Sequence, residues 1–117
     1  MNAKLYVSRL SGTAEAPPSK SAAHRAVVCA GLAPGASRIE NIEYSDDICA
    51  TLDAMAQLGA KIRREPGAVT VEGRRGFATV THPVYCKESG STLRFLIPVF
   101  SLTAQKVRFT GAGRLFD

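Results

Sequence analysis

The sequence predicts an α/β (α+β) fold built from repeated βαβαββ units. Two apolar helical stretches each begin with the pattern Ser-x-Ser, and a shift of 70 residues places the first, at 19–33, on the second, at 89–103. Short strand patterns bounded by Gly and Pro separate these stretches. Helices alternating with short strands are typical of layered α/β domains. The repeat is therefore the main organising feature of the chain.

Two short strands are predicted before the first helix. Residues 4–10 and 13–16 have strand-like composition, and Ser11-Gly12 between them is a turn pattern. We expect the second strand to lead directly into the first helix.

The first helix is predicted from Ser19 to Ala33. Pro17-Pro18 imposes an extended entry, after which Ser19 is a natural N-cap. Pro34-Gly35 ends the apolar run that follows.

The same signals define the later elements. A second helix is predicted from Ser45 to about Gly59, and the acidic pair Asp46-Asp47 in its first turn is explained by the positive end of the helix. The remaining predicted elements are a strand at 37–42, a hairpin of 61–64 and 69–72 turning at 66–67, a strand at 80–86, a helix from 89 to about 102 and a strand at 106–110.

The first turn of the 19–33 helix has the composition of an anion-binding site. Unpaired backbone N–H groups and the positive end of the helix dipole lie beside Lys20, Ser21 and Arg25. Ser21 and Arg25 are four residues apart and therefore share one face. The bland alternative is that Ser19 only caps the helix and that the cations are solvated.

The second copy of the pattern strengthens the anion-site interpretation. Gly90 follows the second capping serine, and a residue without a side chain lets ligand and backbone approach closely, although a simple turn glycine is the alternative. Ser91 and Arg94 repeat the serine and arginine of the first copy. We therefore predict two helix N-termini directed at one polyanionic ligand.

Composition and charge favour a small anionic ligand over a polymer or a membrane. The 117 residues are 45% hydrophobic and 21% charged, with a net charge of +5 and a pI near 9.5. Basic residues are scattered, without a long run, and Trp is absent, which argues against nucleic acid and a membrane surface. The pairs Arg63-Arg64 and Arg74-Arg75 are expected to be exposed loop or edge-strand charge.

The cysteines and histidines have no metal-ligand spacing. Cys29, Cys49 and Cys86 are interpreted as reduced core thiols, and His24 and His82 as packing or surface residues. The sequence lacks a leader pattern and a membrane-length apolar run, so we expect a cytoplasmic location.

Five motifs occur in the order and spacing of one enzyme family. They are Pro-x-Ser-Lys-Ser-x-x-x-Arg at 17–25, Ser-Asp-Asp at 45–47, Leu-Gly-Ala-Lys-Ile at 58–62, Ser-Gly-Ser-Thr-Leu-Arg at 89–94 and Thr-Gly-x-x-Arg at 110–114. On these motifs the chain resembles the N-terminal part of the 5-enolpyruvylshikimate-3-phosphate (EPSP) synthase family, also called 3-phosphoshikimate 1-carboxyvinyltransferase. The resemblance covers essentially the whole chain.

The resemblance implies a fold and an activity. The family's two lobes are inside-out α/β barrels of three βαβαββ units each, of which this chain would be a truncated piece of about one and a half units. Residues 1–14 would belong to the second lobe, and 15–117 would be a partial first lobe with two serine-capped helices. The implied reaction transfers enolpyruvyl from phosphoenolpyruvate to the 5-hydroxyl of shikimate 3-phosphate and releases phosphate. It is the sixth shikimate-pathway step toward chorismate and aromatic amino acids, and it needs no cofactor or metal.

The resemblance also implies roles for individual residues. Lys20 would contact both substrates, Ser21 and Arg25 would bind shikimate 3-phosphate, and Gly90 would line the phosphoenolpyruvate pocket, where glyphosate also binds. Ser91 and Arg94 would be supportive. The proton-transfer groups would lie in the second lobe, and the family's phosphoenolpyruvate-binding arginine would follow Asp117. The chain would then carry no catalytic residue and be inactive alone, with a risk of self-association, whereas the full-length enzyme would be a monomer.

Three alternatives remain open at this point. The first is the related transferase acting on UDP-N-acetylglucosamine, but that family has Asn after the lysine, where this chain has Ser21, and a catalytic cysteine in a later loop. The second is a non-catalytic phosphate-binding module. The third is a plain structural α/β domain with capped helices.

Overall fold

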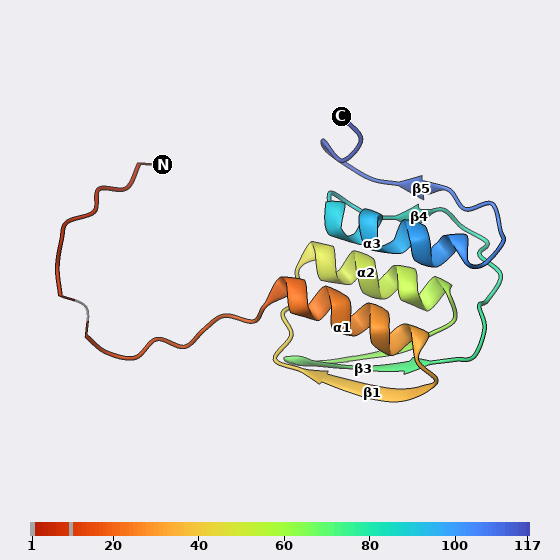
Figure 1. The fold of residues 1–117 in the computed structure, drawn as a ribbon, viewed down its shortest axis with the longest axis horizontal. Coiled ribbons are helices and arrows are strands. Elements are labelled where there is room, and N and C mark those ends of the chain that lie inside the picture. The colour runs from red at the N-terminus through yellow and green to blue at the C-terminus, as the bar shows by residue number, and fades with distance from the viewer. Residues whose placement is uncertain (1, 10) are drawn as a thin grey trace.

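Three helices lie between two small sheets in the computed structural model, which describes residues 2–9 and 11–117 (Figure 1). Strands β1, β3 and β2 form an antiparallel sheet in that spatial order, and β4 pairs with β5 in parallel. The mixed α/β class is as predicted. The elements in chain order are α1 (Lys20–Leu32), β1 (Gly35–Glu40), α2 (Asp46–Gln57), β2 (Lys61–Glu65), β3 (Ala68–Gly73), β4 (Val84–Tyr85), α3 (Gly90–Ser101) and β5 (Phe109–Thr110).

The helices begin at the three serines that the sequence predicts. Ser19, Ser45 and Ser89 each have extended backbone, and each side chain accepts a hydrogen bond from the amide three residues later, at 3.3, 3.4 and 3.1 Å respectively. The starts of α1 and α3 are separated by the predicted 70-residue repeat. Local capping chemistry therefore sets the helix starts.

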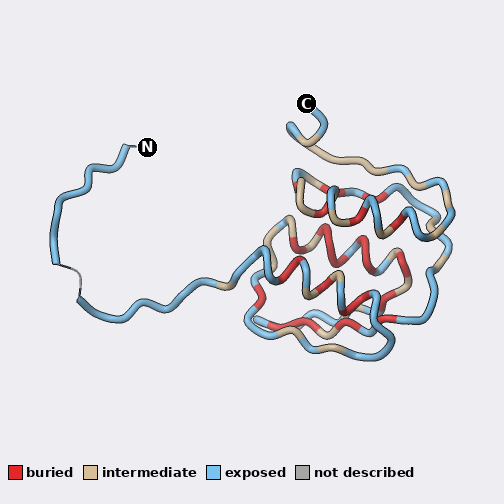
Figure 2. Tube along the Cα trace, in the orientation of Figure 1, coloured by how far each residue is buried: buried red, intermediate tan, exposed pale blue. Residues whose placement is uncertain are grey.

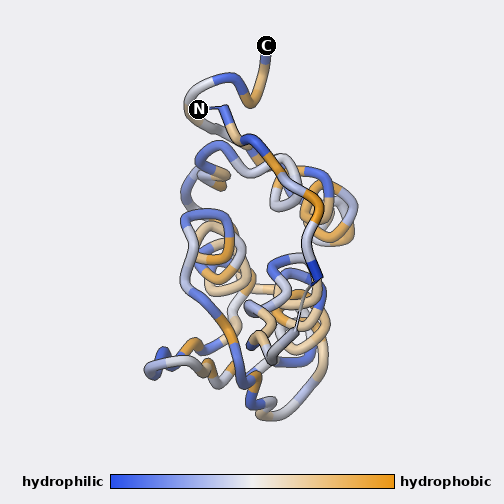
Figure 3. Tube along the Cα trace, turned by 90° about the vertical axis from the view of Figure 1, so that its left-hand side faces the viewer, coloured by the Kyte–Doolittle hydropathy of each residue, from blue (hydrophilic) through white to orange (hydrophobic). Residues whose placement is uncertain are grey.

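All three helices point the same way, so their N-termini lie on one side of the molecule (Figure 1). Figure 3 looks at the molecule from that side, with the helices end-on. The three-stranded sheet packs against α1 and α2. On the opposite side, α3 meets β5 through an edge-to-face contact of Phe100 with Phe109, whose ring centroids are 5.5 Å apart.

The core lies between the helices and the larger sheet (Figure 2). Val27 of α1 and Leu52 of α2 are fully buried there, together with Val69 and Val71 of β3. At the end of β3 the backbone of Gly73 runs directly beneath α1, since a Cβ there would lie 2.0 Å from the carbonyl oxygen of Ala33. This close approach fixes the sheet against the helical layer that carries the site.

The strands expected at 4–10 and 13–16 are not formed. Residues 2–9 and 11–17 are exposed and run away from the helices without strand pairing, and positions 1 and 10 lie outside the described residues (Figures 1 and 2). A strand requires a partner backbone, and the described part of this segment has no neighbouring strand. The assignment of 1–14 to a second lobe stays a prediction.

Three other strands differ in extent from the prediction. The hairpin is as expected. Strand β1 begins two residues earlier than predicted, and it also ends two residues earlier because Asn41, the next residue, adopts a φ of +53°. The expected strands at 80–86 and 106–110 shrink to β4 and β5. Next to them the side chain of Gln105 accepts from the Val80 amide at 2.8 Å and donates to the Ala78 carbonyl at 3.2 Å, so a side chain replaces the ladder.

The predictions for the basic pairs are confirmed, whereas those for the cysteines are confirmed only in part. All three thiols are free; Cys86 is buried and burial raises its pKa, Cys49 is half-buried, and Cys29 is exposed. The core-thiol interpretation is therefore wrong for Cys29, which faces outward on α1. Residues 63–64 lie exposed on the edge strand β2 and 74–75 lie in an exposed loop, as predicted.

Among the described residues, the helices are all too short or too polar to cross a membrane.

Candidate anion-binding site

The N-termini of α1 and α2 meet at Lys20. The Lys20 ammonium donates to Asp47 Oδ2 at 2.7 Å, and the lysine side chain remains 57% exposed. An ammonium has three N–H donors, so this ion pair leaves donors for a further anion. A small cavity between the two helix starts is lined by Pro18, Ser19, Lys20, Ala23, Glu43 and Ser45.

Arg25 lies on the same face of α1 as Ser21, as the spacing predicts. Its Nη1 donates to Ser21 Oγ at 2.9 Å, which leaves the Ser21 O–H free to donate elsewhere. The guanidinium also lies over the ring of Phe95 on α3, 5.9 Å from the centroid. This cation–π contact places the α1 cation beside α3.

Gly90 opens α3 and faces open space. A Cβ built on it would meet only Arg94 Nη2, at 3.9 Å, and its φ lies outside the left-handed region. Arg94 holds this turn by donating from Nε to the Gly90 carbonyl at 3.3 Å. Neither the backbone nor the packing of the described residues requires glycine here, so the approach to the first-turn amides is open.

The acidic pair has a larger role than the sequence indicates. The helix-end explanation accounts for its position, but each carboxylate also binds a lysine from a neighbouring segment: Asp47 binds Lys20, and Asp46 accepts from Lys87 at 2.6 Å. The hydrogen bond from Lys87 lowers the pKa of Asp46 and raises that of Lys87. Helix α2 thereby connects the starts of α1 and α3.

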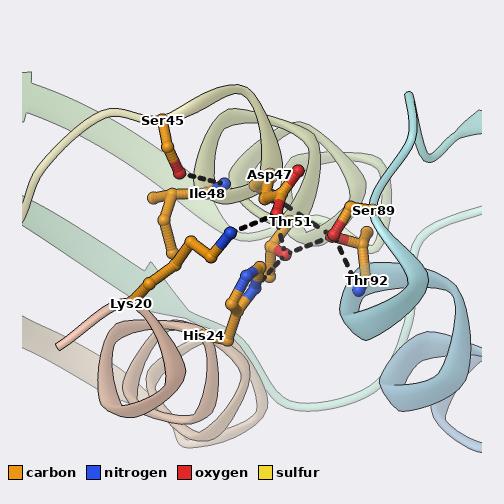
Figure 4. A network of polar contacts seen from close by, with 8 residues as sticks. All are labelled: Lys20, His24, Ser45, Asp47, Ile48, Thr51, Ser89 and Thr92. Atoms are coloured by element: carbon orange, nitrogen blue, oxygen red, sulfur yellow. Dashed lines mark hydrogen bonds and ion pairs between the residues drawn. The ribbon is translucent and has the colours of Figure 1, made fainter. Parts of the chain in front are cut away.

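A buried polar network beneath these residues was not foreseen (Figure 4). His24 Nδ1 lies 2.8 Å from Thr51 Oγ1, which lies 2.8 Å from Thr92 Oγ1, and Thr92 Oγ1 donates to Ser89 Oγ at 2.7 Å. Both threonine hydroxyls also reach the backbone carbonyl of Asp47, at 3.3 and 3.2 Å. The network therefore joins α1, α2 and α3 at their N-terminal ends.

The sequence carries only a weak signal for this network. His24 lies on the apolar face of α1 beside Ala23 and Val27, and the sequence predicts a packing or surface role for both histidines. The structure confirms that His24 is buried, whereas His82 is exposed. The partner of His24, however, is Thr51, which is 27 residues away, and no local sequence pattern connects positions so far apart.

Burial lowers the pKa of His24. The Asp47 carboxylate opposes this shift and the Lys20 ammonium adds to it, but both are smaller than the desolvation of the ring. Nε2 is buried without a hydrogen-bond partner among the described residues. A proton on both ring nitrogens would therefore be poorly accommodated.

The starts of α1 and α3 carry groups that could bind an anion. Lys20, Ser21 and Arg25 offer cations and donors on α1, and the open space before Gly90 leaves the first-turn amides of α3 accessible, whereas the first turn of α2 holds the acidic pair Asp46-Asp47. No group of three or more His, Cys, Asp or Glu side chains within 2–9 and 11–117 is placed to hold a metal ion.

Comparison with known protein families shows to which family the chain belongs. The sequence model of EPSP synthase (3-phosphoshikimate 1-carboxyvinyltransferase) matches residues 6–116. The chain belongs to the EPSP synthase family.

EPSP synthase relatives agree in sequence and in fold. The 3-phosphoshikimate 1-carboxyvinyltransferase of Clostridium beijerinckii is 46% identical over 121 residues, covering 97% of this chain and 28% of the relative. That of Clostridioides difficile is 45% identical over 122 residues, covering 96% and 28%. A solved EPSP synthase from Acinetobacter baumannii superposes with a TM-score of 0.77 at 27% identity, covering 83% of this chain and 22% of that one. The chain thus spans little more than a quarter of the curated relatives it matches.

Proposed function

We propose that this chain supplies the anion-binding half of the substrate site of an EPSP synthase. The protein to which it contributes transfers enolpyruvyl from phosphoenolpyruvate to the 5-hydroxyl of shikimate 3-phosphate. The observation that best supports this is that three parallel, serine-capped helices begin on one side of the molecule (Figure 1). Lys20, Ser21 and Arg25 lie near the start of α1, and the open Gly90 lies at the start of α3. Both substrates are multiply charged anions, which such donors bind well.

The placement of each side chain supports a separate role for it in binding the two substrates. Lys20 keeps free N–H donors beside its pair with Asp47, so it suits contact with both substrates. Ser21 and Arg25 form one hydrogen-bonded unit that suits the shikimate 3-phosphate group. Gly90 suits the phosphoenolpyruvate pocket because nothing in the described chain fills the space before it. Arg94 supports that turn by donating to the Gly90 carbonyl at 3.3 Å, and we assign a supportive role to its neighbour Ser91 as well.

The chain is proposed to bind rather than to catalyse. Enolpyruvyl transfer requires proton donors and acceptors at the reacting carbons, and we assign none of the chain's residues to that role. Residues 1–14 are proposed to join a second lobe that completes the cleft, in a monomeric, cytoplasmic enzyme that uses no cofactor. The isolated chain is expected to have no transferase activity and to risk self-association.

The test is calorimetric titration of the 117-residue chain with shikimate 3-phosphate at low and moderate salt. Lys20→Ala is compared with Lys61→Ala, a matched control whose lysine is exposed on β2 and pairs with Glu72 at 3.4 Å. We expect weak binding that salt weakens further, a loss of about tenfold or more for Lys20→Ala, and no change for Lys61→Ala. Equal affinities of the two variants, or no binding by the unmodified chain, would contradict the proposed half-site.

A further inference from the structure

The four polar side chains buried in the described part of the chain all belong to one network. Thr51 and Thr92 are fully buried, and His24 and Ser89 are each 1% exposed. Elsewhere, the buried side chains of this part are hydrophobic. A buried hydroxyl is costly unless it is hydrogen-bonded, and the shape of threonine could be filled by valine. Packing alone therefore does not explain why the buried hydroxyls gather at this one place.

The network converges on a single backbone atom. The Asp47 carbonyl oxygen lies within hydrogen-bonding distance of two hydroxyls, that of Thr51 four residues later on α2, at 3.3 Å, and that of Thr92 on α3, at 3.2 Å. The carboxylate of the same residue binds Lys20 of α1. One residue of α2 thus fixes a cation on α1 with its side chain and the start of α3 with its backbone.

At α3 the network ends on the helix cap itself. Thr92 contacts Ser89 twice, since its amide donates to Ser89 Oγ at 3.1 Å and its hydroxyl donates to the same atom at 2.7 Å. Gly90 and Ser91 lie between these two residues, and their amides have no partner within the helix. The cap geometry that Thr92 controls therefore sets where these amides point.

Hydrogen bonds fix the relation between helices more sharply than apolar packing does. Each threonine has one O–H proton, so its several contacts are alternatives, and the direction of each bond depends on its neighbours. Apolar contacts between α2 and α3 would tolerate a small sliding motion of one helix along the other. The connected hydrogen bonds permit few relative positions of the two helices.

We propose that Thr51 and Thr92 are positioning residues that hold the first turn of α3 at a fixed place relative to Lys20 and α1. Their hydroxyls, with His24 and Ser89, set the separation of the two anion-binding helix starts. This inference rests on the proposed function only for the identity of the ligand. The hydroxyl network itself is tested without any ligand.

The test compares Thr92→Val, which removes the hydroxyl at nearly constant shape, with Thr92→Ser, which keeps it. Thr103→Val is the matched control, because the Thr103 hydroxyl donates to the Phe100 carbonyl at 2.8 Å at the opposite end of the same helix. Each chain is examined by NMR for helix orientation from residual dipolar couplings, for exchange of the Leu93 amide and for the ring ¹⁵N shifts of His24. If Thr92→Val fails to fold, Thr51→Val is examined in its place.

For Thr92→Val we expect reoriented couplings at the start of α3 relative to α1, about tenfold faster Leu93 exchange and shifted His24 ring signals. Thr92→Ser should resemble the unmodified chain, and Thr103→Val should leave all three readouts unchanged. Unchanged readouts in Thr92→Val, or equal changes in Thr103→Val, would overturn the proposal.

A parallel titration with shikimate 3-phosphate separates this proposal from the proposed function. Weakening of about fivefold or more in Thr92→Val but not in Thr103→Val supports the positioning role. Equal affinity in all variants overturns it. If the unmodified chain does not bind, the proposed half-site fails, and the ligand-free readouts still decide whether the hydroxyls position α3.

Discussion

Gly90→Ala is expected to change folding and ligand binding in opposite directions. The added Cβ would have Arg94 Nη2 as its nearest neighbour, at 3.9 Å, which is ordinary contact, and the backbone is not left-handed. Alanine favours a helix over glycine by up to about 1 kcal/mol, and less at the first position. We therefore expect the free energy of unfolding to rise by between zero and about 1 kcal/mol, and the melting temperature by up to a few degrees.

The same methyl group occupies the space through which a ligand would reach the first-turn amides of α3. We expect affinity for phosphoenolpyruvate to fall by at least about fivefold, and affinity for shikimate 3-phosphate to fall less. Urea denaturation followed by circular dichroism measures the first effect, and NMR titration with each ligand measures the second. A loss of stability above about 1 kcal/mol, or unchanged phosphoenolpyruvate binding, would refute the reasoning.

Two further predictions concern stability. Gly73→Ala should destabilise the chain by at least about 2 kcal/mol in urea denaturation, because its Cβ would lie 2.0 Å from the Ala33 carbonyl oxygen; a near-neutral effect would contradict the packing of β3 beneath α1. Because burial lowers the pKa of His24 below its ordinary 6.5, the unfolded chain binds this proton more readily than the folded chain does. Part of the stability present above pH 6.5 should therefore be lost as the pH falls below 6.5 through the lowered pKa. His24→Asn should flatten that part of the profile, which lies above the range in which Asp46 and Glu65 titrate, and an unchanged slope would exclude His24 as the cause.

Features of the chain that depend on local chemistry could be predicted from the sequence. The helix starts at Ser19, Ser45 and Ser89 follow from side chains that cap backbone amides three residues away. The hairpin follows from Gly67, whose φ of +68° suits the tight turn between β2 and β3. The pairing of Ser21 with Arg25 follows from helical spacing.

Features that depend on distant partners could not be predicted. The segments at 4–10 and 13–16 have strand-like composition, but strand formation depends on a neighbouring backbone that the described part of the chain does not place there. Likewise, Thr51 and Thr92 are 41 residues apart and each would pass for an ordinary helical threonine. The ion pair of Asp47 with Lys20 joins residues 27 positions apart, and it forms only because α2 packs on α1.

Mapping of amide chemical shifts during titration with shikimate 3-phosphate tests most directly whether the starts of α1 and α3 form one anion site. We predict that the amides of Lys20, Ser21, Gly90 and Ser91 shift together with one dissociation constant. Shifts confined to one helix, or spread over the exposed arginines at 63–64 and 74–75, would contradict it.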